Sequence, residues 1–161
     1  MDLDPCSNLN SLVQAKINVI LDLKDEIKRD SGGKFVPGDG LEISWENKTV
    51  FVNPPFINSS EWLIKGMYEV TRGAEIIYLI PDSPDTKIWK NRILLEAKGR
   101  CQIGHRIKFV GMKNTIPKPC SFVYFGKYPD KFKEIFKLYG RVENPSDVYS
   151  DQNYIVLLYF K

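Results

Sequence analysis

The first third of the chain combines a helical pattern with a turn. Apolar residues recur at helical spacing from Leu9 to Ile27, which predicts a helix capped by Ser7 or Asn8. Residues 19–21 also fit a short strand, and this alternative stays open. The Gly-Asp-Gly sequence at 38–40 then predicts a turn, followed by a short half-buried stretch over residues 41–45.

The middle of the chain contains a strand, a helix and a second strand. Residues 49–52 and 74–80 are continuous apolar runs, which is typical of strands that are covered on both faces. Between them, Ser59 or Ser60 begins a predicted helix that ends at Gly73. The pattern predicts a βαβ unit in an α/β domain, with a mainly parallel sheet and helices on both faces.

Shorter elements follow in the second half. The pattern predicts a helix over 87–98, strands over 101–103, 106–110 and 121–125, a basic amphipathic helix over 130–139 and a strand over 154–160. The last elements are expected to form an antiparallel C-terminal hairpin. We expect a single domain over 1–161, with its core over about 3–126 and a C-terminal helix and strand within 127–161. No segment remains for a separate target-recognition domain.

Composition limits the partners and the cellular location that we expect for this protein. The 161 residues carry a formal net charge of +3, which permits a nucleic-acid partner without requiring one. The three cysteines, Cys6, Cys101 and Cys120, form no CxxC pair, so neither a disulfide framework nor a metal site is expected. The sequence shows no signal peptide and no run of about 20 apolar residues, so we expect a cytoplasmic protein without a membrane partner.

The most informative motif is Asn53-Pro54-Pro55-Phe56, directly after the apolar run 50–52. Two prolines cannot continue a strand, so the Asn53 side chain and the Pro54 carbonyl are held rigidly at the strand's carboxyl end. Both groups accept hydrogen bonds, and Phe56 offers a flat surface for stacking. This combination suits an exocyclic amine on a planar base. An ordinary strand-to-helix turn is the alternative for the motif alone.

A basic stretch lies further along the chain. Arg106, Lys108 and Lys113 surround Phe109, and such cations can contact nucleic-acid phosphates. A solvated edge would give the same composition. The neighbouring His105 is expected to be structural, because no catalytic partner for it is evident. Trp62 and Trp89 have core spacing, whereas Trp45 could border a bound adenine.

Taken in order, several elements of the chain resemble the phage-type DNA N6-adenine methyltransferases. These belong to the class I S-adenosylmethionine-dependent amino methyltransferases with an Asn-Pro-Pro-Phe motif. The similarity is carried by Leu3-Asp4-Pro5-Cys6-Ser7, Asp39-Gly40-Leu41 with Trp45, residues 50–56, Leu79-Ile80-Pro81 with Asp85-Thr86, residues 104–109 and residues 121–126. It spans residues 3 to 126.

The resemblance implies a Rossmann-like fold, S-adenosylmethionine as cofactor and duplex DNA with a flipped adenine as partner. Asp4 and Pro5 would lie beside the methionine part of the cofactor. Asp39, with Gly40 and Leu41, would bind its adenine amine, and Asn53 to Phe56 would hold the target base. Asp22 would be a candidate for the ribose only if residues 19–21 form a strand.

Alternatives within and beyond this chemistry stay open. The same reaction could modify another amine, in an RNA base or a protein glutamine. Asp4-Pro5 is followed by Cys6-Ser7-Asn8 without the glycine-rich turn of the superfamily, and little chain precedes it. This favours a catalytically silent protein that binds nucleic acid or a partner. For an active enzyme, we expect short sequence preference, or targeting through a homodimer or a partner subunit.

Overall fold

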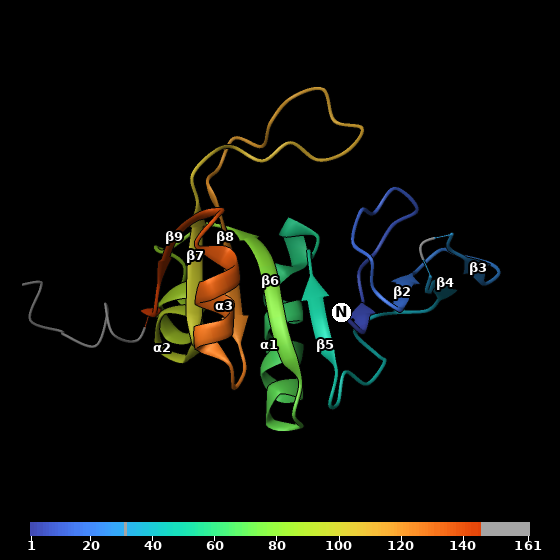
Figure 1. Cartoon of the computed structure of the whole chain (residues 1–161), viewed down its shortest axis with the longest axis horizontal. Helices are drawn as coiled ribbons and strands as arrows, with labels where there is room; N and C mark the ends of the chain where they lie inside the picture. Colours follow the sequence, from blue (N-terminus) through green and yellow to red (C-terminus); the bar gives the residue numbers. More distant parts are fainter. Residues whose placement is uncertain (31, 146–161) are drawn as a thin grey trace, which may run out of the picture.

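The computed structural model describes residues 1–30 and 32–145, which form an α/β structure around a mixed sheet (Figure 1). Nine strands of the described residues lie in the order β3-β4-β2-β1-β5-β6-β8-β7-β9. Their bounds are β1 Leu3–Asp4, β2 Ile17–Ile20, β3 Ile27–Lys28, β4 Lys34–Pro37, β5 Thr49–Val52, β6 Glu75–Pro81, β7 Gly99–Ile103, β8 Cys120–Phe125 and β9 Gly140–Glu143.

Five strands, β4-β2-β1-β5-β6, run parallel to one another. From β1 the chain moves outward through β2 to β4, then crosses back to β5 and β6, so the winding direction reverses between β1 and β5. Leu3 is in register with both Ile17 of β2 and Val50 of β5. In open α/β sheets, ligands bind at the carboxyl ends of the strands beside such a reversal.

The prediction of a mainly parallel sheet is wrong. Four strand pairings are parallel and four are antiparallel among the described residues. The antiparallel half arises because β8 runs against both of its neighbours, β6 and β7. Short antiparallel pairings, β3 with β4 and β9 with β7, complete the two sides of the sheet.

Helices cover both faces of the sheet, as predicted. Figure 1 shows α3 (Pro129–Phe136) in front of the sheet, and α1 (Ser59–Thr71) and α2 (Leu94–Glu96) behind it. A π-helical turn, η2 (Trp89–Ile93), leads into α2. Trp62 and Leu63 of α1 share one core cluster with Trp89, whereas Phe132 of α3 packs with Tyr124 on the opposite face. Gly73, with φ of 88°, follows the end of α1 as predicted.

The predicted helix from Leu9 to Ile27 is wrong, and the alternative strand near residues 19–21 corresponds to β2. Residues 5–16 form a loop in which Leu9 and Leu12 are 58% and 78% exposed. Their helical spacing therefore does not correspond to the buried face of a helix. The β-branched Ile17, Val19 and Ile20 favour a strand. The buried Asn18 side chain stabilises it by donating to the carbonyls of Ala15 and Lys34.

The remaining predictions have mixed outcomes. The strands predicted over 49–52, 74–80, 101–103 and 121–125 correspond to β5, β6, β7 and β8. The helices predicted over 87–98 and 130–139 are shorter than expected, and the strand over 106–110 is a loop. The strand over 154–160 lies outside the described residues. Within the described part of the chain, no helix has the length and apolar character needed to cross a membrane.

Candidate functional site

The predicted site residues follow the carboxyl ends of three parallel strands. Asp4 ends β1, Asp39 lies two residues after β4, and Asn53 directly follows β5. Because these strands run parallel, their carboxyl ends meet at one edge of the sheet. Asp22 also lies at this edge, two residues after β2, and is exposed. The edge therefore brings together residues that are far apart in the sequence.

The turn after β4 packs directly against the residue after β1. A Cβ added to Gly40 would lie 1.7 Å from the Pro5 carbonyl oxygen, so only glycine fits there. The Asp39 carboxylate accepts a hydrogen bond from the Leu41 N–H at 2.8 Å, and the Trp45 indole donates to the Gly40 carbonyl at 2.9 Å. The structure thus joins the two predicted cofactor-binding segments.

Trp45 does not border the site, contrary to the expectation from its proximity to Asp39. Its side chain is fully buried and its ring stacks on that of Trp62, with centroids 6.2 Å apart. Burying an indole is favourable when its N–H finds an acceptor, as it does at Gly40. Trp45 therefore fixes the Asp39 turn from the core side.

Asp4 is a carboxylate buried beneath this edge, only 3% exposed. Burial raises the pKa of Asp4, while weak hydrogen bonds from the Cys6 N–H and the Ser11 hydroxyl, both at 3.4 Å, and the charge of Arg29 partly offset the effect. Ser7 Oγ also acts to lower this pKa, but it is buried and makes no hydrogen bond of normal geometry within the described structure. Burial raises the pKa of the Cys6 thiol too, so this cysteine is not a thiolate nucleophile.

The Asn53 turn carries a second unpartnered polar atom. Asn53 Oδ1 is buried and has no hydrogen-bond partner among the described residues. Pro54 is buried and Pro55 begins a 3-10 turn, in which the Asn58 N–H donates to the Pro55 carbonyl at 3.1 Å. An unmet buried acceptor costs about 1–3 kcal/mol, which a ligand's N–H donor would recover. The two prolines therefore fix the backbone of this turn, and its Asn53 Oδ1 lacks a donor.

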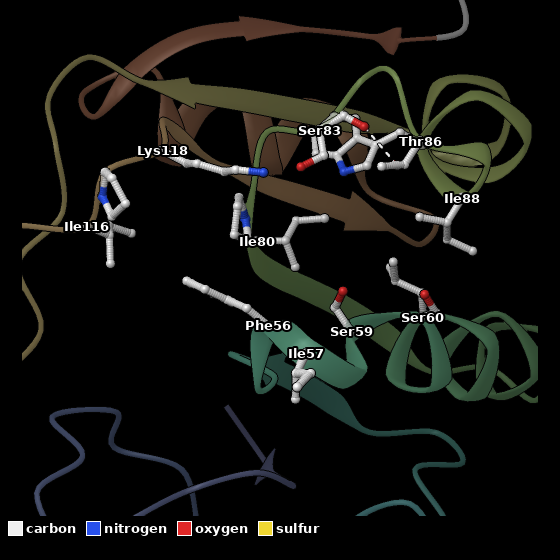
Figure 2. A pocket seen from close by; sticks show the side chains of 14 residues that line it. Phe56, Ile57, Ser59, Ser60, Ile80, Ser83, Thr86, Ile88, Ile116 and Lys118 are labelled. Carbon is white, nitrogen blue, oxygen red and sulfur yellow. Dashed lines mark hydrogen bonds between the residues drawn. The ribbon is translucent and has the colours of Figure 1, made fainter.

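Two hollows flank the turn, and Phe56 lines both. The first, of about 320 Å³, lies towards β1 and is lined by Cys6, Ser7, Asn8, Asn53, Pro54, Pro55, Phe56 and Phe109. The second is a cleft of about 460 Å³ between the first turn of α1, the end of β6 and residues 116–118 (Figure 2). In Figure 2, Ser59 and Ser60 face Ser83 and Thr86 across this cleft. Both hollows are large enough for part of a small-molecule ligand.

The basic stretch forms a loop over residues 104–119, between β7 and β8, instead of the predicted strand. Arg106, Lys108 and Lys113 are exposed on it, because burying unpaired charges in a sheet would cost desolvation free energy. The Ile116 N–H donates to the Ile107 carbonyl at 2.8 Å and thus closes the base of the loop. Figure 1 shows the loop as a long excursion at the carboxyl end of β6.

Phe109 brings this loop into the site. Its ring centroid lies 6.2 Å from that of Phe56, and it lines the first hollow beside Asn53. Sequence reasoning placed Phe109 only within the basic stretch, although an aromatic residue among cations was a usable signal. It also missed the cleft residue Ser83, because no local pattern marks it. No cluster of three or more metal-ligating side chains is found in the part of the chain that the structure describes.

Comparison of the sequence with models of known protein families gives no match, and comparison with curated protein sequences gives none either.

Proposed function

We propose that this protein transfers a methyl group from S-adenosylmethionine to the N6 amine of adenine in DNA. The observation that carries this proposal is the buried, unpartnered Asn53 Oδ1 in a turn fixed by two prolines. An exocyclic amine would donate the missing hydrogen bond. The hollows on either side of Phe56 would take the methyl donor and the acceptor base.

The sheet supports a Rossmann-like methyltransferase domain. Numbered by their order in the chain, its five parallel strands follow the sequence 3-2-1-4-5, which is that of a doubly wound nucleotide-binding sheet without its last strand. The reversal lies between β1 and β5, where Asp4 ends its strand and Asn53 directly follows its own. A ligand bound at this reversal would contact both residues.

The cofactor side has a chemistry that fits a cationic ligand. S-adenosylmethionine supplies an activated methyl group on a positively charged sulfur. The buried Asp4 carboxylate favours a cation nearby, and the unpartnered Ser7 hydroxyl offers a further polar contact. Asp39, held by the close packing of Gly40 on Pro5, would accept from the adenine amine of the cofactor. Asp22, exposed after β2, would reach the ribose hydroxyls.

On the acceptor side, Asn53 Oδ1 and the Pro54 carbonyl would accept hydrogen bonds from the target amine. Both are neutral, and no ionised base is required because the nitrogen becomes acidic only once it carries the methyl group. Phe56 is 42% exposed, so its ring is free to stack on a base taken out of the helix. Phe109 would limit the space beside it.

The basic loop would hold the DNA next to this site. Arg106, Lys108 and Lys113 are exposed on the same loop as Phe109, so phosphates bound there would lie close to Phe56. Phosphate contacts carry no sequence information of their own, which agrees with the short sequence preference expected from the chain. Stricter targeting would require a homodimer or a partner subunit.

The test is methyl transfer from labelled S-adenosylmethionine to unmethylated duplex DNA, with the product identified as N6-methyladenine by mass spectrometry. We expect transfer by the wild type and a loss of at least about 100-fold in Asn53→Ala, as for other groups that stabilise developing charge. Asn58→Ala is the matched control, since Asn58 is exposed and makes no capping bond. No transfer by the wild type, or full transfer by Asn53→Ala, contradicts the proposal.

Parallel reactions separate the alternatives. Methylation of RNA or of a glutamine peptide, with DNA left unmodified, would assign the same chemistry to another amine. Calorimetry with S-adenosylmethionine addresses the catalytically silent alternative, because an enzyme should bind it at roughly micromolar concentration or below. A silent protein should show no heat of binding.

A further inference from the structure

A buried group of charged and polar side chains lies at the carboxyl end of β6. The Asp82 carboxylate accepts hydrogen bonds from the Ser121 hydroxyl at 2.6 Å and from Gln102 at 3.3 Å, and pairs with Arg100 at 3.2 Å. Arg100 also donates to Ser121 at 3.1 Å. Asp82 therefore contacts side chains of both β7 and β8.

Arg100 extends the group on its other side. It donates to the Glu143 carboxylate of β9 at 2.6 Å, and its guanidinium lies 5.4 Å from the centre of the Trp89 ring. The side chains of Arg100, Asp82 and Glu143 are 10%, 8% and 14% exposed. Buried ion pairs often add little net stability, because desolvation offsets their attraction. A role in fixing local geometry explains this arrangement better than stability does.

The position of Asp82 relates this group to the cleft beside Phe56. Pro81 and Ser83, its two neighbours in the chain, line the cleft together with Lys118. Figure 2 shows Ser83 and Lys118 on the side of the cleft across from Phe56 and Ser59. The Asp82 N–H also donates to the Pro119 carbonyl at 2.9 Å. One residue thus ties together the segment after β6 and the end of the basic loop, and both segments face the cleft.

We propose that Asp82 and Arg100 are positioning residues that hold these two segments, which lie side by side across the cleft from α1, in the position needed for the acceptor base. Ser121 bridges them, and Trp89, packed under Arg100, forms part of the cleft lining. The part of this inference that concerns the base depends on the proposed function. The part that concerns the position of the two segments does not depend on that function.

The experiment compares Asp82→Asn and Ser121→Ala with Glu143→Gln. Asp82→Asn keeps the shape of the side chain and removes its charge, and Ser121→Ala removes the bridge. Glu143→Gln removes the other carboxylate bound to Arg100, on the side away from the cleft, and is the matched control. Amide hydrogen exchange of residues 83–89 and 116–119 is measured together with the urea midpoint, so that local opening is distinguished from global loss of stability.

We expect amide exchange in residues 83–89 and 116–119 to become at least about tenfold faster in Asp82→Asn and Ser121→Ala. In Glu143→Gln it should change less than about twofold. In the methylation assay, kcat/KM for DNA should fall at least about tenfold in the first two variants, with the Kd for S-adenosylmethionine unchanged. Arg100→Lys should resemble Asp82→Asn, because lysine lacks the planar, multidentate head group.

Each outcome distinguishes the two proposals. Unchanged exchange in both Asp82→Asn and Ser121→Ala, or an equal effect of Glu143→Gln, overturns the positioning role. Faster exchange with undiminished kcat/KM overturns its link to the acceptor base. If the wild type methylates nothing but exchange is faster in the two variants, the proposed function is rejected and the positioning of the two segments by Asp82 is retained.

Discussion

Gly40 and Pro5 approach so closely that a Cβ on Gly40 would lie 1.7 Å from the Pro5 carbonyl oxygen. This contact sets the Asp39 turn against the end of β1, although Pro5 and Gly40 are 35 positions apart in the sequence. The two halves of the proposed cofactor site therefore depend on the absence of one side chain.

Gly40→Ala should weaken the binding of S-adenosylmethionine by at least about tenfold, or about 1.4 kcal/mol, because the turn must move away from Pro5. Calorimetry measures the affinity, and urea unfolding establishes that the variant is folded. Gly104→Ala is the control, since a Cβ on Gly104 would meet nothing within 4 Å. Equal affinities of the wild type and Gly40→Ala would show that this contact does not shape the cofactor site.

Neutralising the basic loop should weaken DNA binding and reduce its dependence on salt. Each of Arg106→Gln, Lys108→Gln and Lys113→Gln should lower the slope of log K against log salt concentration by about 1, if that side chain contacts a phosphate. Fluorescence anisotropy with a labelled duplex at several salt concentrations measures the slope. Lys133→Gln, an exposed change on α3, should leave it unaltered. Slopes that are unchanged in all three loop variants would remove this loop from the DNA interface.

Arg29 should be important for stability. Its guanidinium donates to the carbonyls of Val13 and Ser11 and to Asn18 Oδ1, and it lies 4.7 Å from the centre of the Phe35 ring. Arg29→Ala should lower the free energy of unfolding by about 2–4 kcal/mol, because it leaves three partly buried acceptors without donors. Urea unfolding is the measurement.

The control for this prediction is Arg141→Ala. The Arg141 side chain is 81% exposed, so its removal should change stability by less than about 0.5 kcal/mol. A loss in Arg29→Ala no larger than that in Arg141→Ala would mean that residues 5–16 are held by other contacts.

Asp4 should give the protein a distinctive pH dependence. Because burial raises its folded pKa above the ordinary value of 3.8, folding favours the protonated form. Its contribution to stability is fully present below pH 3.8 and is lost as the pH rises through the raised folded pKa. The wild type should therefore lose stability relative to Asp4→Asn as the pH rises through this window. Urea unfolding of both proteins across that range measures the difference, and a constant difference would contradict the prediction.

The sequence predicted the strands that are buried on both faces but misread the segments that rely on distant partners. β5 and β6 are continuous apolar runs, so their type follows from local composition. The loop over residues 5–16 is stabilised instead by Arg29, which lies beyond β2, and no local pattern reports such a contact.

The candidate site was predictable only in part for the same reason. The Asn53 turn carries its own signal, because the two prolines specify both the end of the strand and the rigidity of the turn. The fit of Gly40 against Pro5, the position of Phe109 and the cleft beyond Phe56 depend on contacts across the sheet edge. Spacing along the chain cannot give them.

The loop between β1 and β2 has a consequence for the charge of any ligand at this edge. In nucleotide-binding sheets of this order, a helix begins after the first strand, and its N–H groups attract the pyrophosphate of a dinucleotide. Residues 5–16 contain no helix, and the buried Asp4 carboxylate lies at the end of β1. We therefore expect this edge to disfavour a pyrophosphate, so NAD and similar dinucleotides should bind more weakly than a positively charged sulfonium compound.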